Sequence, residues 1–229
     1  MNKKGTLYVI STPIGNRDDI TMRALHILAK CDIIASEDTR HSGMLLSHYG
    51  IKGHYLSYND KNKNRRIPLI VNMLNEGKSI GLISDAGTPL ISDPGYGLIN
   101  AAIDANIDVV PVPGASSVLT ALVGSGLPTD SFIFFGFLPK KGKKKALILQ
   151  SIAHAWQTSI LFESPFRIQK TLQLILEHCG NRKVVLAREL TKIHEEFIRG
   201  YVEEMIIRIK EGNVKLKGEF VILIEGNNA

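Results

Sequence analysis

The segment at residues 84–96, SDAGTPLISDPGY, places the strongest constraint on how this chain can fold. It follows a short apolar run at 79–83, whose length and flanking charges predict a buried strand. The segment holds two Asp, two Gly and two Pro, a composition that favours an irregular loop. Ligands of open α/β sheets bind at the carboxyl ends of strands, so this loop is a candidate ligand site. The alternative is a tight connection with an Asp cap, although plain connections usually span only ~2–6 residues.

Strand patterns alternate with helical patterns through the first half of the chain, which predicts an α/β domain with a mostly parallel sheet. Strands are expected at 6–10, 32–35, 54–57, 79–83 and 108–112. Helices are expected at 21–30, 42–49, 68–77, 98–105 and 117–123. The turn-rich segment 124–129 is the best domain boundary, so the first domain is expected to span residues 1–123.

The second domain, residues 124–229, is expected to be mixed α+β. Strands are expected at 132–137, 158–162, 183–187, 197–201 and 219–225, with helices at 145–152, 168–178 and 202–210. A run of five lysines follows its first strand: Lys140, Lys141, Lys143, Lys144 and Lys145. Taken alone, such a run is most simply a solvated loop.

Composition limits the classes of protein that fit. The 229 residues are 44% hydrophobic and 22% charged, an ordinary globular balance. No apolar stretch approaches the ~20 residues of a membrane span, and the run at 7–10 is too short for a signal peptide. Cys31 and Cys179 stand alone, so we expect reduced core thiols in a cytoplasmic protein. The net charge of +6 favours an anionic partner, either nucleic acid or a polycarboxylate small molecule.

Two further strand ends carry notable residues. The loop at 11–16, STPIGN, matches neither the dinucleotide nor the triphosphate fingerprint. The segment at 36–42 groups Glu37, Asp38, Arg40 and His41 into a dense polar site. The alternative for this segment is a helix N-cap favoured by the helix dipole, which accounts for one of the acids but not for the whole group.

Eight sequence blocks, in order, resemble one family. They are TPIGN (12–16), EDTR (37–40), SDAGTPLISDPGY (84–96), PGAS (113–116), GFLP (136–139), ESPFR (163–167), ELTKIHEE (189–196) and KGEFVIL (217–223). Together they are similar to the small-subunit ribosomal RNA cytidine 2′-O-methyltransferases of the tetrapyrrole-methylase superfamily, from about residue 5 to 226. The chain departs from the usual pattern at Arg17, where Leu is common, and at 143–145, where Arg is often found.

The resemblance implies a two-domain class III α/β methyltransferase with a mostly parallel N-terminal sheet, a mixed C-terminal domain and a cofactor cleft between them. The implied cofactor is S-adenosylmethionine, whose sulfonium is already activated, so no metal is expected. The implied substrate is the ribose of a cytidine in the decoding region of 16S ribosomal RNA, as naked RNA or within an assembled small subunit. A homodimer is also implied.

The same resemblance assigns cofactor contacts to the strand-end loops of both domains. They are Ile14, Ser84, Asp85, Ala86, Thr88, Ser116, Ser117, Phe162, Glu163, Leu190 and Gly218.

Because a ribose hydroxyl is a poor nucleophile, a base within hydrogen-bond reach is expected to help. The resemblance makes Glu37 the first candidate for this base, and Asp38 and Arg40 lie beside it as further catalytic candidates. Lys192, with Glu189 and Glu195, forms a second catalytic candidate set, for which the alternative is an ion-pair group on a helix surface.

RNA contacts are expected from the five lysines and from Arg65, Arg66 and Arg167. Two rival functions share parts of this pattern. One is C-methylation of a tetrapyrrole or another small molecule, and the other is RNA binding without catalysis.

Overall fold

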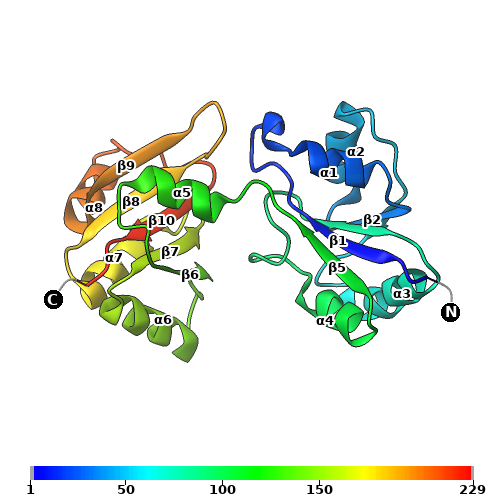
Figure 1. The fold of residues 1–229 in the computed structure, drawn as a ribbon. Helices are drawn as coiled ribbons and strands as arrows, with labels where there is room; N and C mark the ends of the chain where they lie inside the picture. The colour runs from blue at the N-terminus through cyan, green and yellow to red at the C-terminus, as the bar shows by residue number, and fades with distance from the viewer. Residues whose placement is uncertain (1–2, 228–229) are drawn as a thin grey trace. The chain divides into compact units, whose positions relative to one another are not determined.

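The computed structural model describes residues 3–227, and these form two compact units that divide at Ser116 and Ser117 (Figure 1). Each unit contains one five-stranded sheet. The expected boundary after residue 123 falls instead inside a helix, α5 (Ser117–Ser125). This helix packs against β8, β9 and β10 of the second sheet, and Arg199 of β9 donates a hydrogen bond to the Ser125 carbonyl at 3.0 Å. Packing therefore groups α5 with the second unit.

The sheet of the first unit is parallel throughout its described strands, in the order β3-β2-β4-β1-β5. Its strands are β1 (Thr6–Ile10), β2 (Ile33–Ser36), β3 (Tyr55–Ser57), β4 (Ile80–Ile83) and β5 (Asp108–Val112). Its helices are α1 (Met22–Leu28), α2 (Thr39–His48), α3 (Lys63–Asn75) and α4 (Tyr96–Asp104), with a short 3-10 turn η1 at Arg17–Asp19. Because the strands are parallel, all of their carboxyl ends lie at one edge of the sheet.

Helices cover both faces of this sheet (Figure 1). Leu28 of α1 and Leu46 of α2 pack into one buried cluster with strand residues. Ile70 of α3 and Leu98 of α4 pack into a second cluster on the other face. Burial on both faces explains why β4 is apolar along its whole length.

Local capping explains where two helices begin. The Thr21 hydroxyl accepts a hydrogen bond from the Ala24 amide at 3.1 Å and starts α1. Asp38 does the same for α2 by accepting from the Arg40 amide at 2.9 Å. Helix α2 therefore begins at Thr39, earlier than the expected residue 42.

Helix α3 also begins earlier than expected, at Lys63. The sequence predicts a helix over 68–77, but Pro68 lies inside the observed helix. A turn starts the helix instead: the Lys63 amide bonds to the Asn59 carbonyl at 2.9 Å, and the Asn62 side chain accepts from the Asn59 amide at 2.9 Å.

The second unit has a mixed sheet in the order β6-β7-β10-β8-β9, in which only β6 and β7 pair in parallel among the described strands. Its strands are β6 (Phe132–Phe137), β7 (Thr158–Glu163), β8 (Lys183–Arg188), β9 (Glu196–Tyr201) and β10 (Phe220–Ile224). Its further helices are α6 (Lys143–His154), α7 (Ile168–Cys179) and α8 (Val202–Lys210). The mixed α+β organisation expected for this half is confirmed.

The second sheet is also covered on both faces. Ile222 and Ile224 of β10 share a buried cluster with residues of α6, α7 and α8. Val221 and Leu223, which alternate with them, are buried outside that cluster. They therefore face the opposite side, where α5 packs.

Cys31 and Cys179 are free thiols, but instead of lying in the core they are half-buried against its edge. Burial raises the pKa of Cys31 to about 12, which keeps this thiol protonated. Within residues 3–227, no helix is long and apolar enough to cross a membrane.

Candidate functional site

In the first unit, the loops after β1 and β4 are hydrogen-bonded to each other. The amides and carbonyls of Thr12 and Gly87 exchange two bonds, at 2.9 and 3.0 Å. The Thr12 hydroxyl also donates to the Ser84 carbonyl at 3.1 Å. Gly87 has a φ of +80°, a conformation that favours glycine, and a Cβ there would lie 3.2 Å from a methyl group of Ile14.

The loop after β5 joins the same group. The Thr88 hydroxyl donates to the Ala115 carbonyl at 3.2 Å and lies 3.0 Å from the Ser11 hydroxyl. A Cβ on Gly114 would lie 2.9 Å from the Cβ of Ser11, so only glycine fits there without a shift. Three strand ends are thus fixed together, which preorganises the backbone groups of this edge.

The loop after β4 also stores backbone strain. Leu90 and Ser92 have φ values of 73° and 70°, and Gly95 has a φ of 155°. Non-glycine residues in such conformations cost on the order of 1–3 kcal/mol each and cluster at functional sites. The long loop that the sequence singled out is therefore an ordered structure with unusual geometry, and α4 begins directly after it.

Carboxyl groups gather at this edge of the sheet. Glu37, Ser84 and Asp93 line one small hollow, together with the buried Tyr58. Partial desolvation raises the pKa of Glu37, and the nearby charges of Asp85, Asp93 and Asp60 raise it further. Burial likewise raises the pKa of Asp93. Glu37 is consequently a stronger base than an isolated glutamate.

Asp38 and Arg40 have different surroundings from Glu37. The Asp38 carboxylate caps α2, and hydrogen bonds from the Arg40 backbone and side chain lower its pKa. The Asp38 amide donates to the Asp85 carboxylate at 3.2 Å. The Arg40 side chain is 89% exposed and lies 3.4 Å from Asp38. The N-cap alternative thus accounts for Asp38, while Glu37 is left facing the hollow.

The remaining predicted cofactor contacts of this unit surround the same loops. Ile14 is buried against Gly87, so its backbone is the part available to a ligand. Ala86 is exposed, and Ser116 is half-buried at the end of the β5 loop. Ser117, the first residue of α5 and of the second unit, is also half-buried.

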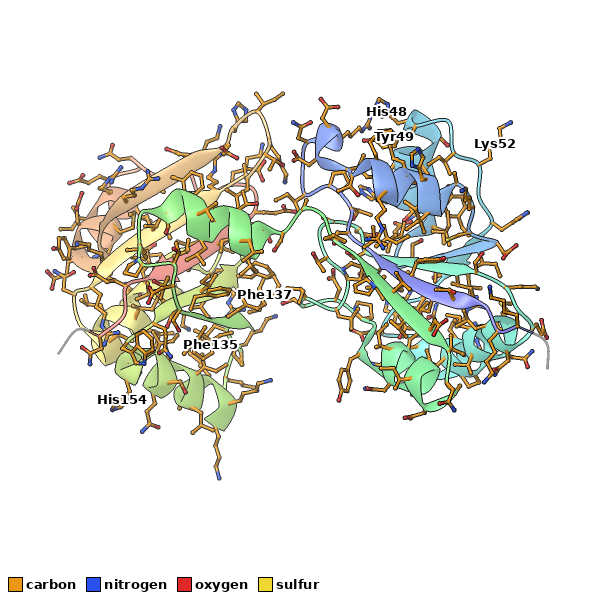
Figure 2. All side chains as sticks on the ribbon, viewed as in Figure 1. His48, Tyr49, Lys52, Phe135, Phe137 and His154 are labelled. Carbon is orange, nitrogen blue, oxygen red and sulfur yellow. The ribbon has the colours of Figure 1, made fainter. Side chains whose placement is uncertain are left out.

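Sheet geometry of the second unit brings several predicted residues to one edge, which we call the loop edge. Strands β6, β7 and β8 end there, and β9 and β10 begin there, because β10 is antiparallel to β7 and β8. The segments at this edge are 138–142, 164–167, 189–195 and 217–219. Phe162, near the end of β7, packs edge-on against Phe134 and Phe137 of β6. The ring centroids are 4.8 and 5.5 Å apart. Figure 2 shows Phe135 and Phe137 on β6.

Glu163 is fully occupied by internal partners. Its carboxylate accepts from the Thr171 hydroxyl at 2.6 Å and the Ser164 amide at 2.8 Å, and it pairs with Arg167 Nε at 3.3 Å. The Arg167 guanidinium also donates to the Leu138 carbonyl. The Glu163 side chain is 0% exposed and that of Arg167 is 28% exposed. Arg167, expected to contact RNA, thus ties β7 to the start of the lysine-rich segment.

Lys192 lies between two carboxylates, at 3.0 Å from both Glu189 and Glu219. Burial lowers the pKa of Lys192, but the hydrogen bonds to Glu189 and Glu219 raise it by more, so the net shift is upward. The segment is a loop and not the helix surface that the alternative required, since Glu189 and Thr191 have φ values of 50° and 63°.

Gly218 supports this loop. It has a φ of +94°, and a Cβ there would overlap the Glu189 carboxyl group. Glu189 in turn accepts from the Glu219 amide at 2.9 Å. Leu190, the next predicted contact, has a buried side chain, which leaves its backbone as the accessible part.

The basic residues divide between the two units. Lys140, Lys141, Lys143 and Lys144 are exposed and Lys145 is half-buried. Lys143–Lys145 open α6 with no side-chain cap, although cations are disfavoured at a helix N-terminus. Arg65 is exposed and Arg66 half-buried in the first turn of α3. Helix stability therefore does not explain the lysine run.

Two residues of these sites were not predicted from the sequence. Asp93 belongs to the singled-out loop, but nothing in the sequence indicated that it would join Glu37 in one hollow. Arg188 is buried and donates to the Lys217 carbonyl at 2.8 Å and to Glu196 at 3.2 Å. A charged residue that ends an apolar strand was the available signal for Arg188.

Comparisons with known proteins bear on these observations. The family described as Tetrapyrrole (Corrin/Porphyrin) Methylases matches residues 6–206. The Ribosomal RNA small subunit methyltransferase I of Pasteurella multocida is 49% identical over 226 residues, which cover 98% of this chain and 80% of the relative. The protein of the same name from Halalkalibacterium halodurans is 47% identical, covering 98% of this chain and 77% of the relative.

Solved structures share the fold at low identity. The methyltransferase CobJ has a TM-score of 0.71 at 17% identity, over 97% of this chain and 94% of that one. Uroporphyrin-III C-methyl transferase from Thermus thermophilus, complexed with S-adenyl homocysteine, has a TM-score of 0.67 at 16% identity, over 96% and 97% of the two chains. The chain thus belongs to the tetrapyrrole methylase family and, within it, to the family of ribosomal RNA small subunit methyltransferase I.

Proposed function

We propose that this chain transfers a methyl group from S-adenosylmethionine to the 2′-oxygen of a cytidine ribose in the decoding region of 16S ribosomal RNA. One observation carries the proposal: Glu37, whose pKa is raised, lies near acids of the loop after β4, which is hydrogen-bonded to the loops after β1 and β5, in a member of this family. The substrate class follows the relatives, which are named ribosomal RNA small subunit methyltransferases.

The loops of the first unit suit this cofactor. The segments 11–16, 84–95 and 113–116 contain no Lys or Arg but offer backbone groups, hydroxyls and carboxylates. S-adenosylmethionine has no phosphate and carries a positive sulfonium, so a site without cationic side chains fits it. Ser84, Asp85, Ala86, Thr88 and Ser116 are the residues proposed to hold it there. The second-unit contacts Ser117, Phe162, Leu190 and Gly218 stay predictions, and for Glu163 only the backbone is available.

When bound, the cofactor supplies a methyl group already activated on the sulfonium. The task left to the chain is to orient the ribose hydroxyl and to receive its proton. Orientation alone contributes roughly 7–11 kcal/mol in well-aligned reactions. Glu37 is the proposed proton acceptor, since its raised pKa strengthens it as a base.

Lys192 has a different proposed role. Its pKa is raised, so it stays protonated and cannot act as a general base at neutral pH. Two carboxylates at 3.0 Å already compensate its charge, so the role proposed for Lys192 is to hold the 189–195 loop in place through Glu189 and Glu219.

A methyl-transfer assay tests the proposal. Purified protein is incubated with methyl-labelled S-adenosylmethionine and small ribosomal subunits from cells that lack the modification. We expect label in the RNA, and we expect Glu37→Gln to lower the rate by about 10²–10⁴-fold while cofactor binding is retained.

Glu76→Gln is the matched control, because Glu76 is an exposed acid just after α3, at the opposite edge of the sheet. Label that enters a porphyrin precursor but not RNA would reject the proposed substrate. An unchanged rate for Glu37→Gln would reject only the assignment of the base.

A further inference from the structure

Phe166 is an aromatic side chain presented almost entirely to solvent. It lies between β7 and α7 and is 95% exposed. A large apolar side chain left in water contributes little to the core, so the fold itself does not account for a phenylalanine at this position.

The backbone around Phe166 is fixed from both sides. Arg167, the next residue, pairs with the buried Glu163 and donates to the Leu138 carbonyl. The Arg167 amide also donates to the Ser164 carbonyl at 2.9 Å, closing a turn around Phe166. The ring is therefore displayed from a rigid support, which limits the entropy cost when it binds a ligand.

The lysine-rich segment starts beside this turn. Strands β6 and β7 are parallel, with Phe137 paired with Phe162. Their following segments, 138–142 and 164–167, therefore leave the sheet at the same edge. Lys140 and Lys141 are exposed on the first of these segments. An exposed aromatic ring thus lies on the segment next to exposed cations.

Exposed aromatic rings next to cations are typical of single-stranded RNA recognition, in which bases stack on rings and phosphates pair with lysines. We propose that Phe166 stacks on an unpaired base of the RNA, and that Glu163 and Arg167 are positioning residues that hold it beside the lysine-rich segment. This inference rests on the proposed RNA substrate and names a residue that would bind an unpaired nucleotide of that RNA.

Affinity for a single-stranded RNA oligonucleotide of the target sequence tests the inference. We expect Phe166→Ala to weaken binding about tenfold without changing the salt dependence, since the substitution removes no charge. Phe166→Tyr keeps a ring and should bind like the wild type. Lys140→Ala/Lys141→Ala should instead reduce the salt dependence.

Ile193→Ala is the matched control, because Ile193 is 98% exposed at the same loop edge but has no ring to stack. It should bind RNA as the wild type does. If Ile193→Ala weakens binding as much as Phe166→Ala, the effect is general apolar contact and the stacking proposal is wrong.

A fluorescence experiment gives a direct readout. The single tryptophan, Trp156, precedes β7 at the opposite edge of the sheet and is replaced by Phe. Phe166→Trp is then introduced, and the RNA should quench the new tryptophan through stacking. The wild-type protein, with Trp156 alone, should show little change.

The outcomes separate the two proposals. If the wild type neither binds nor methylates unmodified small ribosomal subunits, the proposed function fails and the stacking proposal fails with it. If the wild type binds and methylates but Phe166→Ala does both equally well, only the stacking proposal is overturned. The melting temperature and cofactor affinity of Phe166→Ala should equal those of the wild type, which excludes misfolding as the cause of weaker binding.

Discussion

Glu37 and Asp38 are adjacent acids with different roles, and their partners explain the difference. Asp38 accepts hydrogen bonds at the start of α2, which lowers its pKa. Glu37 is partly desolvated and faces other acids, which raises its pKa. The sequence predicted a polar site and ranked Glu37 first through the family resemblance. It could not show that Asp93 would share the hollow, because that depends on the path of a strained loop.

A pH profile tests the influence of Asp93. The proposed base must be a carboxylate, so the rate should rise as pH rises through the pKa of Glu37. Asp93→Asn removes a negative charge that raises this pKa, so the acidic limb of the rate profile should move to lower pH. The measurement is kcat/KM for RNA against pH.

Asp60→Asn provides an internal comparison, since Asp60 is the weakest of the three acidic contributors. Asp60→Asn should also move the acidic limb of the rate profile to lower pH, but by less than Asp93→Asn does. A shift to higher pH in either variant would contradict the assignment of Glu37 as the base.

Gly218 is a second position where one residue decides the local structure. Gly218→Ala should destabilise the protein because it combines positive φ with overlap on Glu189. Gly212 has a φ of +78° with nothing within 4 Å of a built Cβ, so Gly212→Ala isolates the conformational cost of about 1 kcal/mol. We expect Gly218→Ala to cost about 0.5–1.5 kcal/mol more, because the Glu189 side chain must move away from its hydrogen bonds to Lys192 and the Glu219 amide; denaturant unfolding measures the difference. Equal costs would show that close approach at Gly218 is unimportant.

At the scale of elements, sequence patterns located the strands well. The expected strands at 6–10, 108–112 and 132–137 coincide with β1, β5 and β6, because short apolar runs end at clear turn residues. Helix starts were less predictable: α3 begins before Pro68 because an Asn59–Asn62 turn starts it. The hydroxyl contacts that fix three loops together were not predictable, since they join residues far apart in sequence.

The turn between β7 and α7 yields a stability prediction. Arg167→Met leaves the buried Glu163 without its ion-pair partner, and breaking a buried pair costs about 3 kcal/mol. The double variant Glu163→Gln/Arg167→Met removes the uncompensated charge and should recover part of that stability. Urea unfolding measures both. A double variant less stable than Arg167→Met would show that Glu163 is stabilised by its remaining donors alone.

At the scale of the whole chain, the residues predicted two domains of different sheet type, and both sheets are present. The strand orders could not be predicted from patterns, since pairing between distant strands depends on long-range packing. The assignment of α5 to the second unit could not be predicted for the same reason. Its sequence predicts a helix, but only packing shows that this helix contacts β8, β9 and β10.

The net positive charge of the whole chain affects its affinity for RNA. With a net charge of +6 and exposed lysines at the loop edge, RNA affinity should fall steeply as salt rises. Lys143→Ala/Lys144→Ala should reduce the slope of log affinity against log salt by about 0.7 for each RNA phosphate that these lysines neutralise in the wild type. Binding titrations at several salt concentrations measure this. An unchanged slope would remove both lysines from the interface.

The position of the transferred methyl group distinguishes 2′-O-methylation of RNA from methylation of a base or of a tetrapyrrole. Small subunits lacking the modification are treated with the protein and S-adenosylmethionine, and the RNA is digested and mapped by mass spectrometry. We expect one added methyl on the ribose of a single decoding-region cytidine. A methyl found on a base, or transfer only to a tetrapyrrole precursor, would contradict it.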